Sequence, residues 1–211
     1  MGTPAAERQS PGERPLVAFD FDGTLTVKDS FTAFLAWKAG RIGYALGLLS
    51  LSHELLIYLV RRDRGRLKAK AAAVFLAGLS PAQVTELAES FAEARAQRLF
   101  RPDALMAWNQ WRDQGAELVI VSASPGIMLE PFARRLRADR LIATKLAVDG
   151  QGLVTAQLDG VNCRGLEKVE RLKAIYGPDV RLDAAYGDTS GDHEMLQLAK
   201  VRGYRVFKGK P

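Results

Sequence analysis

The sequence predicts an α/β protein in which helices flank a parallel sheet, with an all-helical cap inserted after the first strand. Two observations support the sheet. Residues 16–19 and 117–121 form continuous apolar runs, typical of strands buried on both faces. Each run is followed by acidic or small polar residues and a glycine. The third observation supports the cap, because no strand pattern occurs between Thr26 and about Ala116, where the spacing of apolar residues is helical.

The composition is that of an ordinary globular protein, with 47% hydrophobic and 26% charged residues among 211. The formal net charge of +6 favours acidic partners such as phosphorylated metabolites or anionic lipid. We find no nucleic-acid-binding motif and expect no nucleic acid partner. Cys163 is the only cysteine, which excludes an intramolecular disulfide and fits a reducing cytoplasm. We therefore expect a cytoplasmic protein, with the inner face of the membrane as an alternative location.

The first strand leads directly into a pair of carboxylates. Residues 1–15 are polar, lack the apolar segment of a signal peptide and are interpreted as a flexible tail. After the strand, Asp20 and Asp22 can emerge on one side of the sheet, and Gly23 permits a sharp turn. Buried carboxylates are costly unless they bind a cation, and Mg²⁺ would hold them and leave room for a phosphate. The alternative is a solvated Asp-Gly turn.

The cap is expected to span residues 28–100, and the core to comprise residues 16–27 and 101–211. Cap helices are predicted at 28–38, 66–76 and 81–100. Asp29 or Ser30 can start the first of these helices, Gly78 ends the second, and Ser80 caps the third.

Residues 42–60 form an almost wholly apolar segment that contains His53 and Glu54. A dense basic run follows at 61–70. Three interpretations stay open: a buried cap helix with a solvated basic end, a helix that contacts a membrane surface through 42–70, and a membrane span. The span is the least favoured, because a His-Glu pair in hydrocarbon would be costly.

The remainder of the core alternates between helices and strands. Helices are expected at 102–114, at 125–137 and from about Lys168 to Gly177, and strands at 117–121, 141–146, 181–186 and 204–207. A hairpin is predicted at 145–158, turning at 149–152.

Polar residues with chemical potential follow two of these strands. Ser122 ends the strand at 117–121 just before a helix, where a small hydroxyl suits a phosphate, although a plain Ser/Pro turn is the alternative. Asp188 and Asp192 lie four residues apart in a glycine-flanked loop after the strand at 181–186, which again suggests a bound cation. His193 and Glu194 are assigned to the next helix and not to the site.

These motifs, in this order, resemble those of the haloacid dehalogenase superfamily of phosphotransferases. The four segments are DFDGTLT at 20–26, Ser122, Lys168 four residues before Leu172, and GDTSGD at 187–192. The resemblance implies a Rossmann-like core. The length and helicity of the insertion are similar to the cap of the phosphoserine-phosphatase-like branch.

The resemblance also implies residue roles. Asp20 would be the nucleophile and Asp22 the general acid and base, while Lys168 would pair with the nucleophile and the phosphate, with Arg164 as the alternative. Phosphate binding would fall to Thr24, Ser122 and Ala123. Asp29 would face the substrate from the cap, start its helix, or do both. Mg²⁺ would be held by Asp20, Asp188 and Asp22, the last through its backbone carbonyl, with Asp192 binding through water or anchoring the ligands.

The implied function is Mg²⁺-dependent hydrolysis of a phosphate monoester through an aspartyl phosphate. Two substrates compete. The chain resembles phosphatidylglycerophosphate phosphatases of this superfamily in the DGTL…DSF start, in the apolar cap helix with a basic end, and in the run 165–172. This favours a lipid phosphate over a small soluble phosphomonoester such as phosphoserine. A third alternative is a binding module that holds a phosphorylated ligand without turnover.

Overall fold

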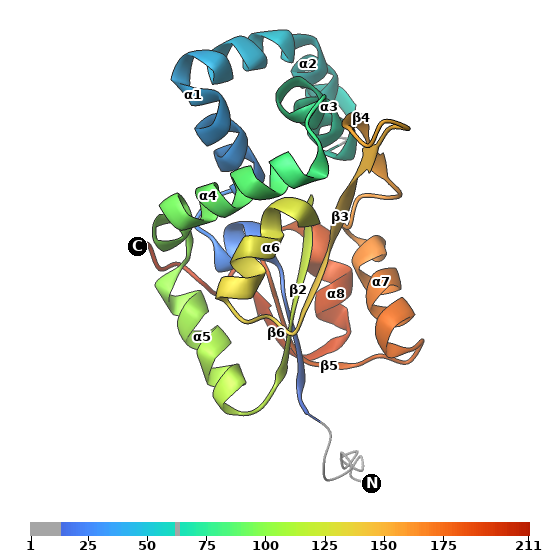
Figure 1. Cartoon of the computed structure of the whole chain (residues 1–211). Coiled ribbons are helices and arrows are strands. Elements are labelled where there is room, and N and C mark those ends of the chain that lie inside the picture. The colour runs from blue at the N-terminus through green and yellow to red at the C-terminus, as the bar shows by residue number, and fades with distance from the viewer. Residues whose placement is uncertain (1–13, 62–63) are drawn as a thin grey trace, which may run out of the picture.

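The computed structural model describes residues 14–61 and 64–211, which form a core built on one sheet and a helical cap above it (Figure 1). Within these residues the strand order is β4-β3-β2-β1-β5-β6. All neighbours pair in parallel except β4, which is antiparallel to β3. The predicted α/β class is therefore confirmed. The strands are β1 Leu16–Phe19, β2 Glu117–Pro125, β3 Arg140–Val148, β4 Val154–Asp159, β5 Leu182–Gly187 and β6 Ala199–Tyr204.

Helices cover both faces of the sheet, as Figure 1 shows. The helices are α5 Pro102–Asp113 and α6 Gly126–Arg135 on one face, and α7 Leu166–Tyr176 and α8 His193–Gln197 on the other. Alternation along β1 explains the two cores, because Val17 and Phe19 pack with α5 and α6 whereas Ala18 packs with α7 and α8. A strand that is buried on both faces has no polar positions, which is why the run at 16–19 is continuous.

The described part of the cap contains four α-helices, which lie between β1 and α5 in the chain. They are α1 Ser30–Ser50, α2 Ser52–Arg61, α3 Arg64–Leu76 and α4 Pro81–Leu99. Ser80 caps α4 as predicted: its hydroxyl accepts from the Gln83 N–H, and the Gln83 side chain accepts from the Ser80 N–H. At the foot of the cap a bridge between Thr26 and Phe100 brings its two connections together.

The prediction of one helix over 42–60 is wrong, because this segment is divided between α1 and α2. Helix α1 bends at Gly40, which has φ +67°, and continues to Ser50 instead of ending near residue 38. Leu51 is buried and turns the chain, so that α2 continues at 59° to α1. Among the described residues no single helix has the length and apolarity of a membrane span. Two bent pairs of helices, α1 with α2 and α3 with α4, have that length and apolarity only when each pair is taken together.

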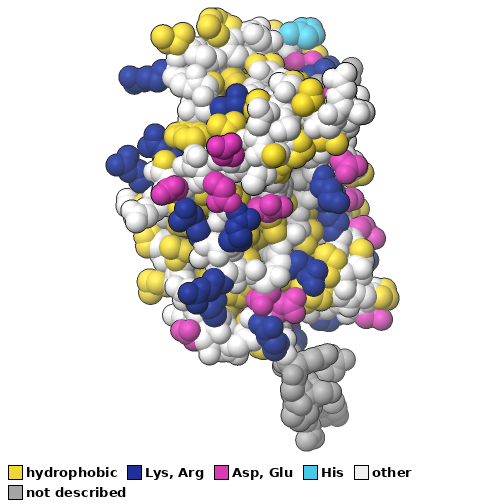
Figure 2. Space-filling view, in the orientation of Figure 1, with side chains coloured by type: hydrophobic (Ala, Val, Ile, Leu, Met, Phe, Trp, Pro, Cys, Tyr) yellow, Lys and Arg dark blue, Asp and Glu magenta, His cyan; other side chains and the backbone are white. Residues whose placement is uncertain are grey.

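The division leaves part of the apolar segment exposed. Ile42 is 79% exposed, Leu49 69% and Leu56 63%, while Leu51 is buried. Hydrophobic side chains gather over α1 and α2 at the upper end of the molecule in Figure 2. The segment 42–60 thus belongs to a helix pair that is partly buried in the cap and partly on its surface.

The predicted hairpin is present as β3 and β4 and it reaches the cap (Figure 1). The Val154 N–H donates to the Leu79 carbonyl at 2.9 Å, and the Gly78 N–H donates to the Val154 carbonyl at 3.3 Å. Val154 is buried in the same cluster as cap residues Phe75 and Leu76. Helix α3 therefore rests on β4 as well as on the other cap helices.

One further expectation is corrected near the C-terminus. The last strand is β6 Ala199–Tyr204 and not 204–207, because Arg205 turns the chain away with φ +54°. Phe207, which suggested a strand, packs its ring at 5.2 Å from that of Tyr186 instead. Residues 1–13 of the predicted tail lie outside the described residues. Arg14, the first described residue, is held by hydrogen bonds to the carbonyls of Gly115 and Ala116.

Candidate active site

The site lies where three neighbouring parallel strands end at the same edge of the sheet. Asp20 follows β1, Ser122 lies within β2, and Asp188 follows β5. The Asp20 N–H donates to the carbonyl of Tyr186 at 2.8 Å, which extends the pairing of β1 and β5 up to the first carboxylate. Parallel pairing thus brings together groups that are about 100 and 170 residues apart in the chain.

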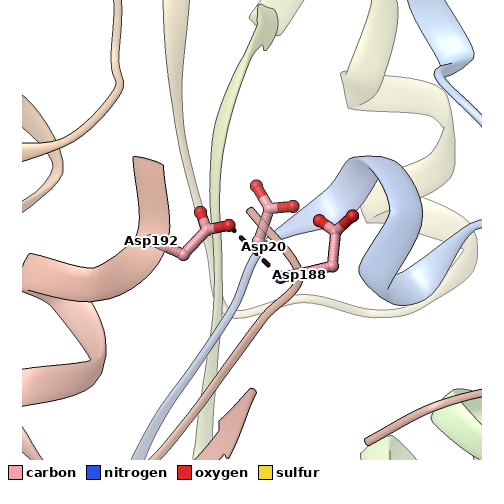
Figure 3. Close-up of side chains that lie close together, drawn as sticks. All are labelled: Asp20, Asp188 and Asp192. Carbon is pink, nitrogen blue, oxygen red and sulfur yellow. Dashed lines mark hydrogen bonds between the residues drawn. The ribbon is translucent and has the colours of Figure 1, made fainter. Parts of the chain in front are cut away.

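Three carboxylates meet at this edge (Figure 3). Oxygen atoms of Asp20, Asp188 and Asp192 lie within 4.8 Å of one another, a spacing that fits a divalent cation bound by oxygen ligands. Both oxygens of Asp192 are already occupied: Oδ1 accepts from Lys168, and Oδ2 accepts from the N–H groups of Asp188 and Thr189. Asp192 therefore anchors the loop that carries Asp188, and Asp20 and Asp188 are the two predicted direct ligands whose side chains share this cluster.

Lys168 ties this cluster together. Its side chain is 1% exposed, and Nζ donates to Asp20 and Asp192, each at 2.7 Å, and to the carbonyl of Val121 at 2.6 Å. All three of its protons are used, so the buried ammonium leaves no donor unpaired. Burial alone would lower the pKa of Lys168, but the two carboxylates raise it above its usual value. The lysine stays charged beside the nucleophile candidate.

Arg164, the alternative to Lys168, is directed elsewhere. Its guanidinium donates to the hydroxyls of Thr189 and Ser190, each at 3.1 Å. It lines the pocket and supports the loop that carries Asp188, whereas Lys168 makes the contact with Asp20.

The two carboxylates of the first motif have different surroundings. Burial raises the pKa of Asp20 to about 7, against the lowering effect of Lys168. The carboxylate of Asp22 lies apart from the acidic cluster, where it accepts from the Ser30 N–H at 2.6 Å and from the Ser124 hydroxyl at 2.5 Å. Burial, followed by the charge of Asp29, raises the pKa of Asp22. A raised pKa favours the protonated form, which can donate a proton.

The residues predicted to bind phosphate are placed as follows. The Thr24 hydroxyl lies 3.3 Å from Asp20 Oδ2 and 3.4 Å from Asp188 Oδ1, so it bridges the two ligand candidates. Ser122 is buried, accepts from the Ser124 N–H, and lines the pocket together with Ala123.

Asp29 caps helix α1 and also lines the pocket. Its carboxylate accepts from the Thr32 N–H at 2.7 Å, as a helix cap does, and the residue lines the pocket. The helix start and the pocket wall coincide here because α1 begins at the site.

Sequence reasoning missed two cations. Lys68, in α3, donates to the Ala123 carbonyl at 2.9 Å and to the Ser124 hydroxyl at 3.2 Å, and burial lowers its pKa. Arg101 donates to the carbonyls of Gly23 and Thr26 and holds the first motif in place. Lys68 stands in a run with many basic residues, and nothing in that run distinguishes it from its neighbours.

A pocket of about 680 Å³ opens between the core and the cap above these groups. Its core side carries the carboxylates, Ser122 and Lys168. Its cap side is largely apolar and is lined by Leu35, Leu48, Leu51, Leu55, Tyr58, Leu67, Ala71 and Phe75. The pocket thus has an acidic end, where a cation could bind, and an apolar end.

Comparisons with known proteins identify the family of the chain. The family model of haloacid dehalogenase-like hydrolases matches residues 17–197. The chain is 56% identical over 201 residues to Protein CicA of Caulobacter vibrioides, which covers 95% of this chain and 90% of that protein.

Solved structures share the fold. A protein of unknown function from Bordetella pertussis Tohama I has a TM-score of 0.70 at 21% identity, covering 87% of this chain and 86% of the other. Phosphoserine phosphatase in its apo form has a TM-score of 0.58 at 20% identity, covering 89% and 84%.

Proposed function

Because the chain belongs to the haloacid dehalogenase-like hydrolase family, we propose that it is a Mg²⁺-dependent phosphatase that hydrolyses a phosphate monoester through an aspartyl phosphate. The observation that carries the proposal is the contact between Asp20 and the buried Lys168 beside Asp188. A carboxylate held by a cation, next to a second carboxylate on the core side of a pocket, suits attack on a phosphate.

Asp20, Asp188 and the backbone carbonyl of Asp22 would hold Mg²⁺. When bound, the ion would neutralise charge on the phosphate oxygens and bring the phosphate close to Asp20. The fit is supported by the oxygen-only donor set and by the carboxylate oxygens of Asp20, Asp188 and Asp192, which lie within 4.8 Å of one another.

The chain's own residues perform two half-reactions in this proposal. A carboxylate oxygen of Asp20 attacks phosphorus while the bond between phosphorus and the alcohol oxygen breaks, and Asp22 gives its proton to that oxygen. Asp22 then takes a proton from a water whose oxygen attacks the same phosphorus, which releases inorganic phosphate and restores the Asp20 carboxylate. Ser122 donates to a phosphate oxygen during both steps, while Lys168 holds Asp20 and contributes its positive charge beside the phosphate.

The test is release of phosphate from p-nitrophenyl phosphate with and without Mg²⁺. We expect Mg²⁺-dependent turnover in the wild type and only background turnover in Asp20→Asn. The melting temperature of Asp20→Asn should stay within a few degrees of the wild-type value. Asp179→Asn, which removes an exposed carboxylate far from the site, is the control and keeps full activity. Turnover by Asp20→Asn, or none by the wild type with any metal, contradicts the proposal, and the latter result favours a binding module.

We further propose that the substrate is an amphiphilic phosphate monoester, such as the lipid phosphate phosphatidylglycerophosphate. The apolar cap side of the pocket supports this, because Leu48, Leu51 and Leu55 offer nothing polar to a small metabolite. Asp29 in the pocket wall supports the alternative, a phosphoserine-like substrate whose amino group would face this carboxylate.

A substrate panel separates the two. Phosphatidylglycerophosphate in micelles, glycerol 3-phosphate and phosphoserine are compared by kcat/KM. The lipid proposal expects the acylated compound to exceed glycerol 3-phosphate by about tenfold or more, and Leu55→Asp to remove that advantage without lowering the rate on glycerol 3-phosphate. A preference for phosphoserine, lost in Asp29→Asn, establishes the alternative instead.

A lipid substrate implies contact of the cap with a membrane surface, and we propose that α1 and α2 make it. The exposed side chains of Ile42, Leu49 and Leu56 support this contact. They lie on α1 and α2, and other residues of these two helices line the pocket. Co-sedimentation with anionic liposomes tests it. We expect binding by the wild type and loss in the Leu49→Asp/Leu56→Asp double variant. Met106→Asp, at an exposed apolar position of α5, is the control and still binds. Equal sedimentation of the three proteins refutes the contact.

A further inference from the structure

Lys68 is a cap residue whose ammonium lies at the catalytic edge of the core. It projects from α3, lies 5.5 Å above the ring of Phe31, and donates to the Ala123 carbonyl and the Ser124 hydroxyl. The proposed reaction assigns it no step. Its two core contacts lie just beyond Ser122, in the strand end that faces the pocket.

The hydroxyl that Lys68 contacts is also bound to Asp22. Ser124 Oγ lies 3.2 Å from Lys68 Nζ and 2.5 Å from Asp22 Oδ2. A lysine ammonium can only donate, and a serine hydroxyl has a single proton. Ser124 must therefore accept from Lys68 and direct its own proton at Asp22. Hydrogen-bond donation therefore runs in one direction, from Lys68 to Ser124 and from Ser124 to Asp22.

The other oxygen of Asp22 also depends on the cap. Oδ1 accepts from the N–H of Ser30, the first residue of α1, at 2.6 Å. Both oxygens thus accept from groups that connect to the cap: Oδ1 from the first residue of α1, and Oδ2 from a core serine that also accepts from Lys68 of α3.

We propose that Lys68 is a positioning residue: through the Ser124 hydroxyl it sets the orientation of the Asp22 carboxyl, so that docking of the cap completes the proton donor. This inference rests on the proposed phosphatase function. It concerns the step in which the leaving alcohol oxygen takes a proton, and that step matters most for alcohols that are poor leaving groups.

The dependence on the leaving group gives a readout that a merely structural role would not move. p-Nitrophenyl phosphate and benzyl phosphate are similar in size, but only the second needs a proton donor to release its alkoxide. In Lys68→Met, which keeps an apolar stem and loses the donors, we expect kcat on benzyl phosphate to fall about tenfold or more beyond any fall on p-nitrophenyl phosphate.

Two further variants complete the test. Ser124→Ala should show the same selective loss, and the Lys68→Met/Ser124→Ala double variant should lose no more than either single one, because both act on the same carboxyl. Lys70→Met, on the same helix and outside the pocket lining, is the control and keeps the wild-type ratio. If Lys68→Met does not fold, Ser124→Ala alone decides.

The outcomes separate this inference from the function on which it rests. Hydrolysis of neither ester by the wild type removes the phosphatase and this inference together. Hydrolysis of both by the wild type, with an equal fall on both in Lys68→Met and in Ser124→Ala, overturns only the positioning role.

Discussion

Gly23 shows how closely the backbone of the first motif approaches Asp188, a predicted metal ligand. Its φ is +84°, and a methyl group at this position would overlap the carboxylate of Asp188. Gly160 has almost the same φ, +85°, with nothing within 4 Å of where a Cβ would lie. Substituting Gly160 therefore tests backbone strain alone, whereas substituting Gly23 tests strain together with the close approach to Asp188.

This pair gives a prediction for single substitutions. Gly23→Ala and Gly160→Ala should each lower the free energy of unfolding by about 1 kcal/mol. Only Gly23→Ala should also displace Asp188, weaken Mg²⁺ binding and lower kcat/KM by about tenfold or more. Denaturant unfolding and calorimetric Mg²⁺ titration measure the two effects. Equal metal affinity in the two variants contradicts this view of Gly23.

The raised pKa of Asp20 predicts that Mg²⁺ binding depends on pH. Burial raises this pKa to about 7, so that below this value the metal-free site carries a proton that the ion must displace. Affinity should therefore rise with pH up to about 7 and then level off, with a roughly tenfold weaker affinity one unit below the pKa. Titration calorimetry in two buffers of different ionisation enthalpy measures the released proton.

The control for this pH dependence is Asp20→Asn, which should bind Mg²⁺ weakly and lose most of the pH dependence. The remaining dependence would come from Asp188, whose pKa burial also raises. Equal wild-type affinity at about pH 6 and about pH 8, with no proton release, would show that Asp20 is ionised throughout.

At the residue scale, the local sequence predicted which site residues follow the strands, but it did not predict which residues meet across the pocket between the core and the cap. Asp20 and Asp188 could be placed together because parallel strands end at one edge. The sequence did not show that the carboxylate of Asp22 faces Ser124, since the two residues are 102 positions apart in the chain. Lys68 could not be distinguished from the other cations of its run, because only packing of α3 on the core selects it.

At the scale of elements, the bend in α1 has a specific cause. Gly40 has φ +67° and ψ 174°, a conformation that is essentially restricted to glycine, and nothing lies within 4 Å of its would-be Cβ. Gly43, one turn later, is helical, and a methyl group there would make an ordinary contact with Ala39 at 3.5 Å.

Alanine substitutions at these two positions should act in opposite directions. Gly40→Ala is expected to destabilise the protein by about 1–3 kcal/mol through backbone strain alone. Gly43→Ala should stabilise it by up to about 1 kcal/mol, because alanine restricts the unfolded chain and suits a helix. Thermal unfolding followed by circular dichroism measures both. A stabilising Gly40→Ala would mean that α1 can run straight.

Elements were predictable where the local pattern and the packing agree. Strand β1 and helix α4 follow their patterns, with α4 marked by Ser80 and Pro81. The segment 42–60 was misread because its apolar residues face two environments, and composition does not record where the chain turns. The last strand was misplaced because Phe207 packs on Tyr186 as a strand residue would.

At the scale of the whole molecule, the cap is attached at more than its two chain connections. The hydrogen bonds of Val154 to Leu79 and Gly78 join β4 to the link between α3 and α4. Val154 is 3% exposed, whereas Val148, its cross-strand partner in the same hairpin, is 49% exposed. The two valines therefore test the attachment with matched chemistry.

A carboxylate at Val154 should loosen the cap, because it would be buried against α3 without a partner. We expect Val154→Asp to speed proteolytic cleavage within residues 51–80 about tenfold or more, while the core fragments stay resistant. Val148→Asp should leave the pattern unchanged. Limited proteolysis read by mass spectrometry decides, and protection of the cap in both variants would show that the hairpin contact is dispensable.

The hairpin also determines what would have to move if this enzyme were given another specificity. A chimera that exchanges only residues 28–100 would place a foreign α3 on a β4 shaped for the original one. If residues 145–159 were transplanted along with those helices, both partners of the hydrogen bonds at Gly78 and Leu79 would come from the same parent protein. The exchangeable unit of this architecture is thus discontinuous in the chain, and recombination breakpoints chosen from the helices alone would cut through it.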